Sequence, residues 1–259
     1  MTALKAVTRE VSPSIGNCEL TYLARQAIDL DRARTQHRQY EECLTGLGCE
    51  IIRLAAEPRL PDSVFVEDTA VVIDELAVIA RPGARSRRAE TQAVAEILAG
   101  YRRISHIQLP GTLDGGDVLV AGKMVFVGIS RRTNQGGFAQ MRSLLTPFGY
   151  KVEGVPVVGA LHLKSAVGLV AEDTLLINPK WAYAGQFEDM RLIEVAADEP
   201  NGANALLVGK VVVYPAHHPA TRERLEARGI SVRTVDMSEL AKAEGGVTCC
   251  SLIFPEGPG

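Results

Sequence analysis

The sequence predicts an α/β protein built from five repeated units, each made of two strands, a helix and a further strand. Two observations lead to this prediction. A polar motif before a strand recurs at Asp68, Asp117, His162, Asn204 and Cys249, with separations of 49, 45, 42 and 45 residues. No composition break or flexible linker separates the copies. A period of this length is typical of one supersecondary unit repeated along the chain.

Five such units can close around an axis as the blades of a propeller, an arrangement that leaves no long exposed sheet edge. We therefore expect a five-bladed, pseudo-symmetric α/β propeller of ββαβ-type repeats, with residues 1–259 in a single domain. An open α/β sheet is the alternative. In both arrangements the polar motifs converge at the same end of the first strands, so carboxylates, a histidine and a thiol surround one pocket.

The individual elements follow this pattern in chain order. The chain opens with a short strand at 4–8, and apolar residues spaced by three and four from Leu30 to Leu47 predict a helix that Gly48 ends. A strand follows at 49–54. The next repeats open with strand pairs at 70–73 and 76–80, 118–120 and 124–127, 166–171 and 174–178, and 205–208 and 211–214. Helices are expected at 94–98, at 138–148 and after Pro219, and the fifth copy opens at Gly245.

Composition and charge narrow the class of protein. Hydrophobic residues make up 46% and charged residues 23% of the chain, as in ordinary soluble globular proteins. The formal net charge of −3 gives no reason to expect nucleic acid or an anionic membrane as a partner. No apolar run has the length of a membrane span, and the N-terminus has no signal-like segment. The five cysteines lack C-x-x-C spacing, so we expect reduced thiols in a cytoplasmic protein, and a homodimer is compatible with the sequence.

The thiol of Cys249 is the first candidate for chemistry. It lies in Gly245–Cys250, a glycine turn before an apolar strand, where a buried core cysteine is commoner than a nucleophile. Its correspondence with His162 favours the nucleophile, because a reactive thiol needs a neighbouring proton carrier. A catalytic histidine in turn needs a carboxylate that fixes its orientation, and Asp114 or Asp117 could supply it. Aspartates in a glycine-rich turn can also simply bond local amides, so one of the two can be structural.

A cluster of carboxylates indicates the ligand. Asp62, Glu67 and Asp68 gather around Phe65, beside an apolar strand, where they repel one another unless a cation lies among them. A bound metal, structural arginines and a cationic ligand are the three explanations. A metal is the least favoured, because the segment has no histidine and no loop pattern typical of hard cations. A guanidinium group suits the cluster, since its fork of donors matches pairs of carboxylates.

These groups together predict a reaction at a guanidinium carbon. Arg87 and Arg132 occupy equivalent loops and could bind the carboxylate of an amino acid, although both could also be solvated surface residues. We expect a thiol to displace an amine from the guanidinium carbon through a covalent thiouronium-type intermediate, which water then converts to a ureido product. Neither a cofactor nor a metal is expected for this chemistry.

Five stretches in chain order resemble the dimethylarginine dimethylaminohydrolases of the guanidine-modifying superfamily. They cover nearly the whole chain: Phe65–Ala70, Gly111–Leu119, Arg132–Asn134, Leu161–Ser165 and Thr248–Ser251. The resemblance implies a five-bladed α/β propeller and hydrolysis of monomethylated or asymmetrically dimethylated arginine. The implied products are citrulline and methylamine or dimethylamine.

The resemblance also implies residue roles. Cys249 matches the nucleophile, His162 the general acid/base, and Asp114 the carboxylate that orients it, although some members carry glutamate at that place. The matches to substrate-binding residues are Asp62, Phe65, Glu67 and Asp68 around the guanidinium, Arg87 and Arg132 at the carboxylate, and Leu20 in a lid formed by the N-terminal loop.

The nearest alternative is an arginine deiminase-like hydrolase of unmethylated arginine. Agmatine deiminase would not need Arg87 and Arg132, and an amidinotransferase would use an amine in place of water. A non-catalytic propeller that only binds a ligand is an alternative of another class. Such a binding module would not be expected to retain Cys249, His162 and Asp114 together.

Overall fold

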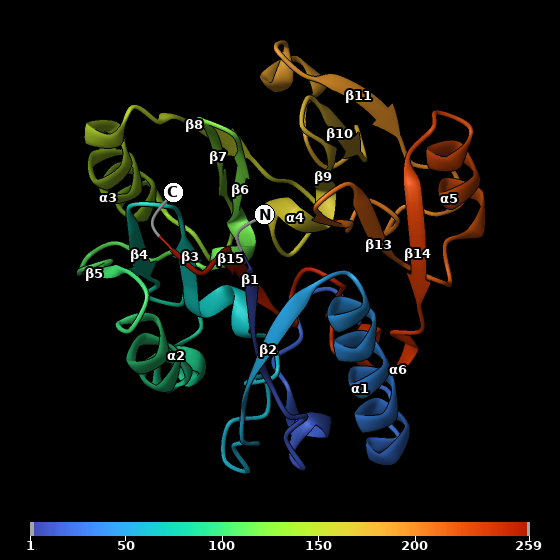
Figure 1. Cartoon of the computed structure of the whole chain (residues 1–259), viewed down its shortest axis with the longest axis horizontal. Coiled ribbons are helices and arrows are strands. Elements are labelled where there is room, and N and C mark those ends of the chain that lie inside the picture. Colours follow the sequence, from blue (N-terminus) through green and yellow to red (C-terminus); the bar gives the residue numbers. More distant parts are fainter. Residues whose placement is uncertain (1–2, 258–259) are drawn as a thin grey trace.

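Five three-stranded sheets stand around a common axis in the computed structural model, which describes residues 3–257. Figure 1 shows the sheets as blades of a ring, with helices α1, α2, α3 and α5 on the outside. The arrangement confirms the predicted five-bladed α/β propeller and excludes the open sheet.

Four blades come from consecutive segments of the chain. In each of them the first strand pairs antiparallel with the second, and the second pairs parallel with the third. The strands of these blades are β3 (Ala70–Val72), β4 (Leu76–Ile79) and β5 (Arg103–His106); β6 (Val118–Ala121), β7 (Met124–Ile129) and β8 (Lys151–Pro156); β9 (Val167–Ala171), β10 (Thr174–Ile177) and β11 (Arg191–Glu194); and β12 (Leu206–Val208), β13 (Val211–Pro215) and β14 (Ser231–Val235).

The fifth blade joins the two ends of the chain. Its first strand is β15 (Leu252–Pro255), which pairs antiparallel with β1 (Leu4–Arg9), and β1 pairs parallel with β2 (Cys49–Leu54). The C-terminal segment therefore supplies the strand that is missing before β1. This pairing closes the ring and covers a strand edge that would otherwise be exposed.

Helices connect the second and third strands of four blades. They are α1 (Leu30–Gly46), α2 (Thr91–Leu98), α3 (Gln135–Leu145) and α5 (Pro219–Glu226). The blade of β9–β11 differs from the predicted ββαβ unit, because it has only the 3-10 turn η6 (Ala184–Phe187) there. Pro179 and Gly185 in this connection disfavour a longer helix. The other short helices are α4 (Leu163–Ala166) and α6 (Ser238–Ala241).

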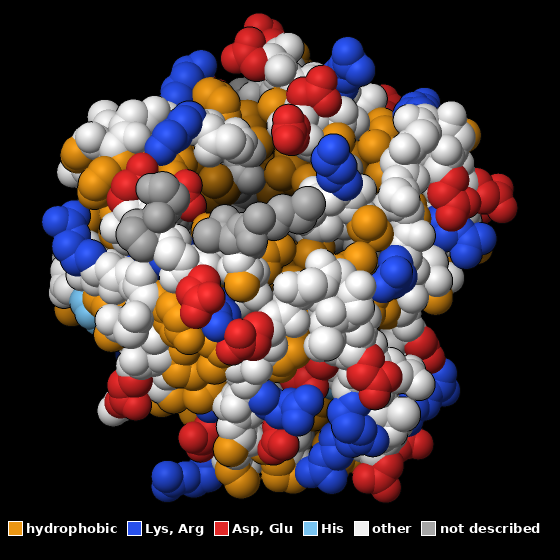
Figure 2. Space-filling view, viewed as in Figure 1, with side chains coloured by type: hydrophobic (Ala, Val, Ile, Leu, Met, Phe, Trp, Pro, Cys, Tyr) orange, Lys and Arg blue, Asp and Glu red, His pale blue; other side chains and the backbone are white. Residues whose placement is uncertain are grey.

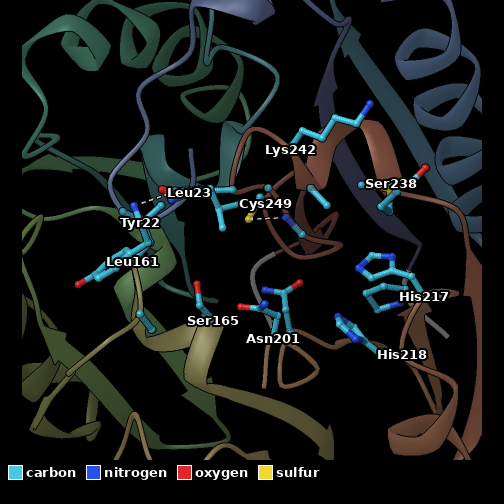
Figure 3. Close-up of a pocket in the computed structure, with 18 of the residues that line it drawn as sticks. Tyr22, Leu23, Leu161, Ser165, Asn201, His217, His218, Ser238, Lys242 and Cys249 are labelled. Carbon is cyan, nitrogen blue, oxygen red and sulfur yellow. Dashed lines mark hydrogen bonds between the residues drawn. The ribbon is translucent and has the colours of Figure 1, made fainter. Parts of the chain in front are cut away.

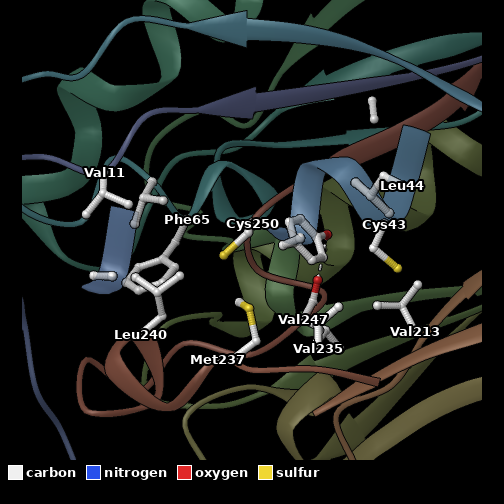
Figure 4. Close-up of a cluster of buried hydrophobic side chains, with 14 of the residues drawn as sticks. Val11, Cys43, Leu44, Phe65, Val213, Val235, Met237, Leu240, Val247 and Cys250 are labelled. Carbon is white, nitrogen blue, oxygen red and sulfur yellow. Dashed lines mark hydrogen bonds between the residues drawn. The ribbon is translucent and has the colours of Figure 1, made fainter. Parts of the chain in front are cut away.

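The adjacent residues Cys249 and Cys250 differ in burial, because Cys250 alone lies within the core beneath β1 and β15. Cys250 is fully buried in a cluster with Leu44, Phe65 and Met237, and Figure 4 shows its side chain among these apolar groups. The hydroxyl of Tyr40 donates to the carbonyl of Val247 at 2.8 Å and fixes the turn that precedes the thiols. Cys250 is thus a core residue.

The surface carries charges of both signs. Figure 2 shows Lys and Arg side chains interspersed with Asp and Glu side chains around the rim of one face. This mixture agrees with the small net charge of the chain. None of the helices within residues 3–257 combines the length and the apolar composition that a membrane crossing requires.

Candidate active site

The five polar motifs meet at one end of the first strands and are hydrogen-bonded to one another in a ring. Each motif bonds the motif of the next blade through a backbone amide or carbonyl or a short side chain. The bonds are Gly116 N to Asp68 Oδ1 (3.0 Å), Leu163 N to Asp117 Oδ1 (2.9 Å), Asn204 Nδ2 to Lys164 O (3.0 Å), Asn204 Nδ2 to Thr248 Oγ1 (3.0 Å) and Glu67 N to Cys249 O (3.1 Å). The repeated motif therefore positions the site and also joins the blades.

His162 lies between two carboxylates. Its Nε2 is 3.0 Å from Asp114 Oδ2, and its Nδ1 is 3.7 Å from Asp68 Oδ1. Burial lowers the pKa of His162, but Asp68 and the hydrogen bond with Asp114 outweigh it and raise the pKa to about 9. Gly116 allows this approach, because a Cβ there would lie 2.7 Å from His162 Nδ1. The imidazole is consequently protonated at neutral pH.

Asp114, and not Asp117, is the partner of the imidazole. The carboxylate of Asp117 accepts from Leu163 N at 2.9 Å and from Ser130 Oγ at 2.7 Å. One oxygen of Asp117 thus holds the segment that follows His162, and the other holds the loop after β7. Burial raises the pKa of Asp117 to about 6. Within the described residues the imidazole thus hydrogen-bonds to Asp114 and not to Asp117, and the catalytic role of Asp114 stays a prediction.

The thiol of Cys249 has few partners. Gly246 N donates to its sulfur at 3.3 Å, and Thr248 Oγ1 lies 4.0 Å away. Burial raises the pKa of Cys249 to about 12, and the nearby carboxylates of Glu67 and Asp68 add to this effect. In the free protein the group is therefore a neutral thiol at neutral pH.

The carboxylate of Glu67 is occupied on both oxygens. Lys164 Nζ donates to Oε1 at 2.7 Å, and Thr248 Oγ1 donates to Oε2 at 2.7 Å. Burial raises the pKa of Glu67 in spite of the neighbouring ammonium group. The sequence predicted no role for these two partners, although both lie in stretches that carry the family resemblance, Leu161–Ser165 and Thr248–Ser251.

Arg87 is an internal brace. It is 4% exposed, forms ion pairs with Asp68 and Glu90, and also donates to the carbonyls of Asp62 and Phe65 at 3.3 and 3.1 Å. His162 and Arg87 together outweigh burial and hold the pKa of Asp68 at about 2. Pairing with a structural arginine was one of the three explanations for the acidic cluster, and the ion pairs of Arg87 agree with that explanation.

Arg132 retains a donor without a partner. Its Nη2 donates to Thr21 Oγ1 at 3.3 Å, whereas Nη1 is buried and has no hydrogen-bond partner among residues 3–257. Asp62 is 5% exposed, and both its oxygens accept from Glu19 N, at 3.2 and 3.1 Å. Burial raises the pKa of Asp62.

Two cavities meet at Cys249. The narrower one has about 20 Å³, the space of a single water molecule, and its lining contains most of the predicted site: Asp62, Phe65, Asp68, Arg87, Arg132, His162 and Cys249. The wider cavity has about 510 Å³ and shares Leu161, Glu244, Gly245 and Cys249 with the narrow one. Figure 3 shows the Cys249 sulfur facing it, with Tyr22, Lys242, His217 and His218 around it.

Leu20 stays a prediction as the lid residue. It is half-buried and packs against the core, and within the described chain it belongs to the lining of neither cavity. Its neighbours Glu19, Tyr22 and Leu23 do line them. Side chains of the N-terminal loop other than Leu20 therefore line both cavities, within the part of the chain that the structure describes.

Known proteins resemble this chain over its whole length. A family model described as N,N dimethylarginine dimethylhydrolase, eukaryotic, matches residues 21–180. The N(G),N(G)-dimethylarginine dimethylaminohydrolase of Streptomyces coelicolor is 39% identical over 259 residues, which are 99% of each chain. That of Pseudomonas aeruginosa is 36% identical over 228 residues, 87% of this chain and 90% of the relative. The chain belongs to the dimethylarginine dimethylaminohydrolase family.

Solved structures agree with this assignment. A cysteine-to-serine variant of the Pseudomonas aeruginosa protein, complexed with citrulline, has a TM-score of 0.93 and 34% identity, and the match covers 98% of this chain and 100% of that one. The N-terminal domain of a cyanobacterial arginine dihydrolase reaches a TM-score of 0.87 at 16% identity, which shows a shared fold alone. The resemblance seen in the sequence motifs is confirmed.

Proposed function

We propose that the protein hydrolyses monomethylated or asymmetrically dimethylated arginine to citrulline and methylamine or dimethylamine. The observation that carries the proposal is the meeting of Cys249 with the His162–Asp114 pair at a cavity lined by buried carboxylates. Family membership and the citrulline complex of the Pseudomonas aeruginosa relative support the same chemistry.

Substrate binding divides between the two ends of the ligand. Asp68 and Asp62 attract the guanidinium, and Phe65 gives that end of the cavity an apolar wall. The unpartnered Nη1 of Arg132 is the donor for the α-carboxylate of the substrate. Arg87 acts mainly through Asp68, which it holds in place, and Glu67 acts through its charge, because its oxygens are already bonded.

The resting charges suit a cationic substrate. With the pKa of Cys249 at about 12 and that of His162 at about 9, the free enzyme holds a thiol and an imidazolium at pH 7. A guanidinium beside the thiol offsets the carboxylate charges that keep the thiol protonated. Substrate binding therefore favours loss of the thiol proton to solvent, so the nucleophile forms only when the substrate is present.

The reaction then follows in two displacements. The thiolate forms a C–S bond with the guanidinium carbon, and His162 gives its proton to the methylated nitrogen as the C–N bond breaks. The amine leaves, and a thiouronium remains on Cys249. Water attacks the same carbon and passes one proton to the neutral His162. The C–S bond breaks, the second proton restores the thiol, and citrulline is released.

The test is a comparison of substrates. The protein is incubated with asymmetric dimethylarginine, monomethylarginine, arginine and agmatine, and the ureido product and released amine are measured. Turnover of the methylated substrates with at least tenfold lower kcat/KM for arginine supports the proposal. Preferential turnover of arginine, with ammonia as the released amine, would assign the deiminase reaction instead.

A further inference from the structure

The loop between η1 (Ile15–Asn17) and α1 spans the opening of the site. We name residues 19–27 of this loop the strap. It contains no helix or strand, and Tyr22 and Leu23 at its tip are 46% and 42% exposed. The strap lines both cavities, Glu19 the narrow one and Tyr22, Leu23 and Gln26 the wide one. Its position therefore decides how a ligand reaches Cys249.

One carboxylate holds the tip of the strap. Glu244 accepts hydrogen bonds from three successive backbone amides, with its oxygens 3.0 Å from Thr21 N and 2.7 Å from Leu23 N, and a third bond from Tyr22 N. Bonds from amides to a charged carboxylate are stronger than those between neutral groups. Glu244 itself lines both cavities and is separated from Cys249 by only four residues.

The backbone of Glu244 has a positive φ angle, which indicates that its side chain is kept for its contacts. Its φ is +59°, and it is the one non-glycine residue with positive φ within residues 3–257. A glycine takes this conformation without steric cost, whereas a residue with a Cβ does not. Gly245 and Gly246 follow, and Gly246 N donates to the sulfur of Cys249. The strained residue thus begins the turn that carries the thiol.

The strap also contacts the groups assigned to substrate binding. Arg132 Nη2 donates to Thr21 Oγ1 at 3.3 Å, and the guanidinium of Arg131 lies 5.8 Å from the centre of the Tyr22 ring. At the other end Glu19 N donates to both oxygens of Asp62. With the strap in this position the narrow cavity has about 20 Å³, the space of a single water molecule. An amino acid can occupy this cavity only when one of its walls moves, and the strap supplies one of them through Glu19.

We propose that Glu244 is the latch of the strap, a positioning residue that closes the N-terminal loop over a bound substrate. The predicted effect of the latch on KM rests on the proposed hydrolysis of methylated arginine. If only the latched form retains the substrate, the apparent affinity is the intrinsic affinity multiplied by the latched fraction. Weakening the latch therefore raises KM more than it changes kcat.

Two variants and a matched control test the latch. Glu244→Gln keeps the size but removes the charge, and Glu244→Gly removes the side chain and relieves the positive φ. Glu188→Gln changes an exposed glutamate without a hydrogen-bond partner among the described residues. Steady-state kinetics with asymmetric dimethylarginine give kcat and KM. Limited trypsin digestion gives the rate of cleavage after Arg25, an exposed residue of the strap.

The latch predicts one combination of results. Both Glu244 variants speed cleavage after Arg25 by up to about tenfold, the effect of losing about one charged hydrogen bond, and they raise KM severalfold because the latched fraction falls. kcat changes less than threefold, and Glu188→Gln behaves as the wild type. Glu244→Gly melts at or above the temperature of the wild type, because glycine suits the positive φ.

The opposite results overturn the proposal. Unchanged KM and unchanged cleavage after Arg25 in both variants would show that the three amide bonds do not hold the strap. A lower melting temperature of Glu244→Gly with equal losses in kcat and KM would make Glu244 a general structural residue. If the wild type does not hydrolyse dimethylarginine, the proposed function fails, and the cleavage rates alone decide the latch.

Discussion

Replacing Glu67 by glutamine should raise the reactivity of the Cys249 thiol and lower the turnover of dimethylarginine. The pKa of the thiol is raised to about 12 by burial and then by the charge of Glu67. At pH 8 roughly one thiol in 10⁴ is therefore ionised. Removing one nearby carboxylate lowers the thiol pKa by about one unit and raises the thiolate fraction about tenfold. Because a less basic thiolate is also about threefold less nucleophilic, the net gain in reactivity is about threefold.

The same substitution should impair turnover. Glu67 neutralises Lys164, whose Nζ lies 2.7 Å from its carboxylate. In the Glu67→Gln variant this ammonium group is left uncompensated near Cys249, where the proposed cationic substrate reacts. We expect kcat/KM for dimethylarginine to fall at least about tenfold, since charged hydrogen bonds contribute about 1.5–3 kcal/mol.

The assay compares a neutral reagent with the cationic substrate. Iodoacetamide labelling at pH 8, followed by peptide mapping, reports the reactivity of Cys249, with the Cys249→Ser variant as background. Steady-state hydrolysis of dimethylarginine gives kcat/KM. Labelling that is unchanged or slower in the Glu67→Gln variant would refute the proposed control of the thiol by the buried carboxylates.

Three further predictions follow from the site. Arg132→Lys raises KM for dimethylarginine at least about tenfold with a smaller change in kcat, because it removes the unpartnered planar donor; equal KM in initial-rate kinetics contradicts this. His162 has a folded pKa of about 9 against an unfolded 6.5, so its stabilisation is complete below pH 6.5 and lost as the pH rises through 9. In urea titrations the wild type should lose about 3 kcal/mol more between pH 6 and pH 10 than His162→Gln, and parallel losses contradict this. Cys250→Ser keeps turnover within about threefold but lowers stability by about 1 kcal/mol, since Cys250 is buried in the core; lost turnover contradicts this.

The repeat period was sufficient to predict the blades. Each copy brings a polar motif, a hairpin and a third strand, so the period marks where each sheet begins. It did not indicate how β1 and β2 complete a sheet, because their partner β15 lies at the other end of the chain. It also implied a helix in every unit, whereas Pro179 and Gly185 leave only a 3-10 turn in the third.

Site residues that recur at equivalent places in the repeat were predictable from the sequence. The hydrogen-bond partners of individual side chains were not. His162 and Cys249 were found through their equivalent places in the repeat. The repeat left the choice between Asp114 and Asp117 open, because both lie in one turn and only the backbone path directs them to different partners. The family resemblance alone pointed to Asp114. Arg87 was assigned to a loop that contacts substrate, but Glu90 three residues later pairs with it in the interior.

Contacts that cross the ring left no pattern in the sequence. Glu244 bonds amides more than two hundred residues earlier in the chain, and nothing in the sequence around it marks a turn with positive φ at a glutamate. The partners of Glu67 were missed for the same reason, since Lys164 and Thr248 come from two other blades.

The proposed reaction requires a covalent intermediate on Cys249. Acid quench during turnover of dimethylarginine, followed by peptide mass spectrometry, measures it directly. We expect an adduct with the mass of the substrate less dimethylamine on Cys249, and neither adduct nor turnover in the Cys249→Ser variant. An adduct on Cys250, or turnover that survives Cys249→Ser, would contradict it.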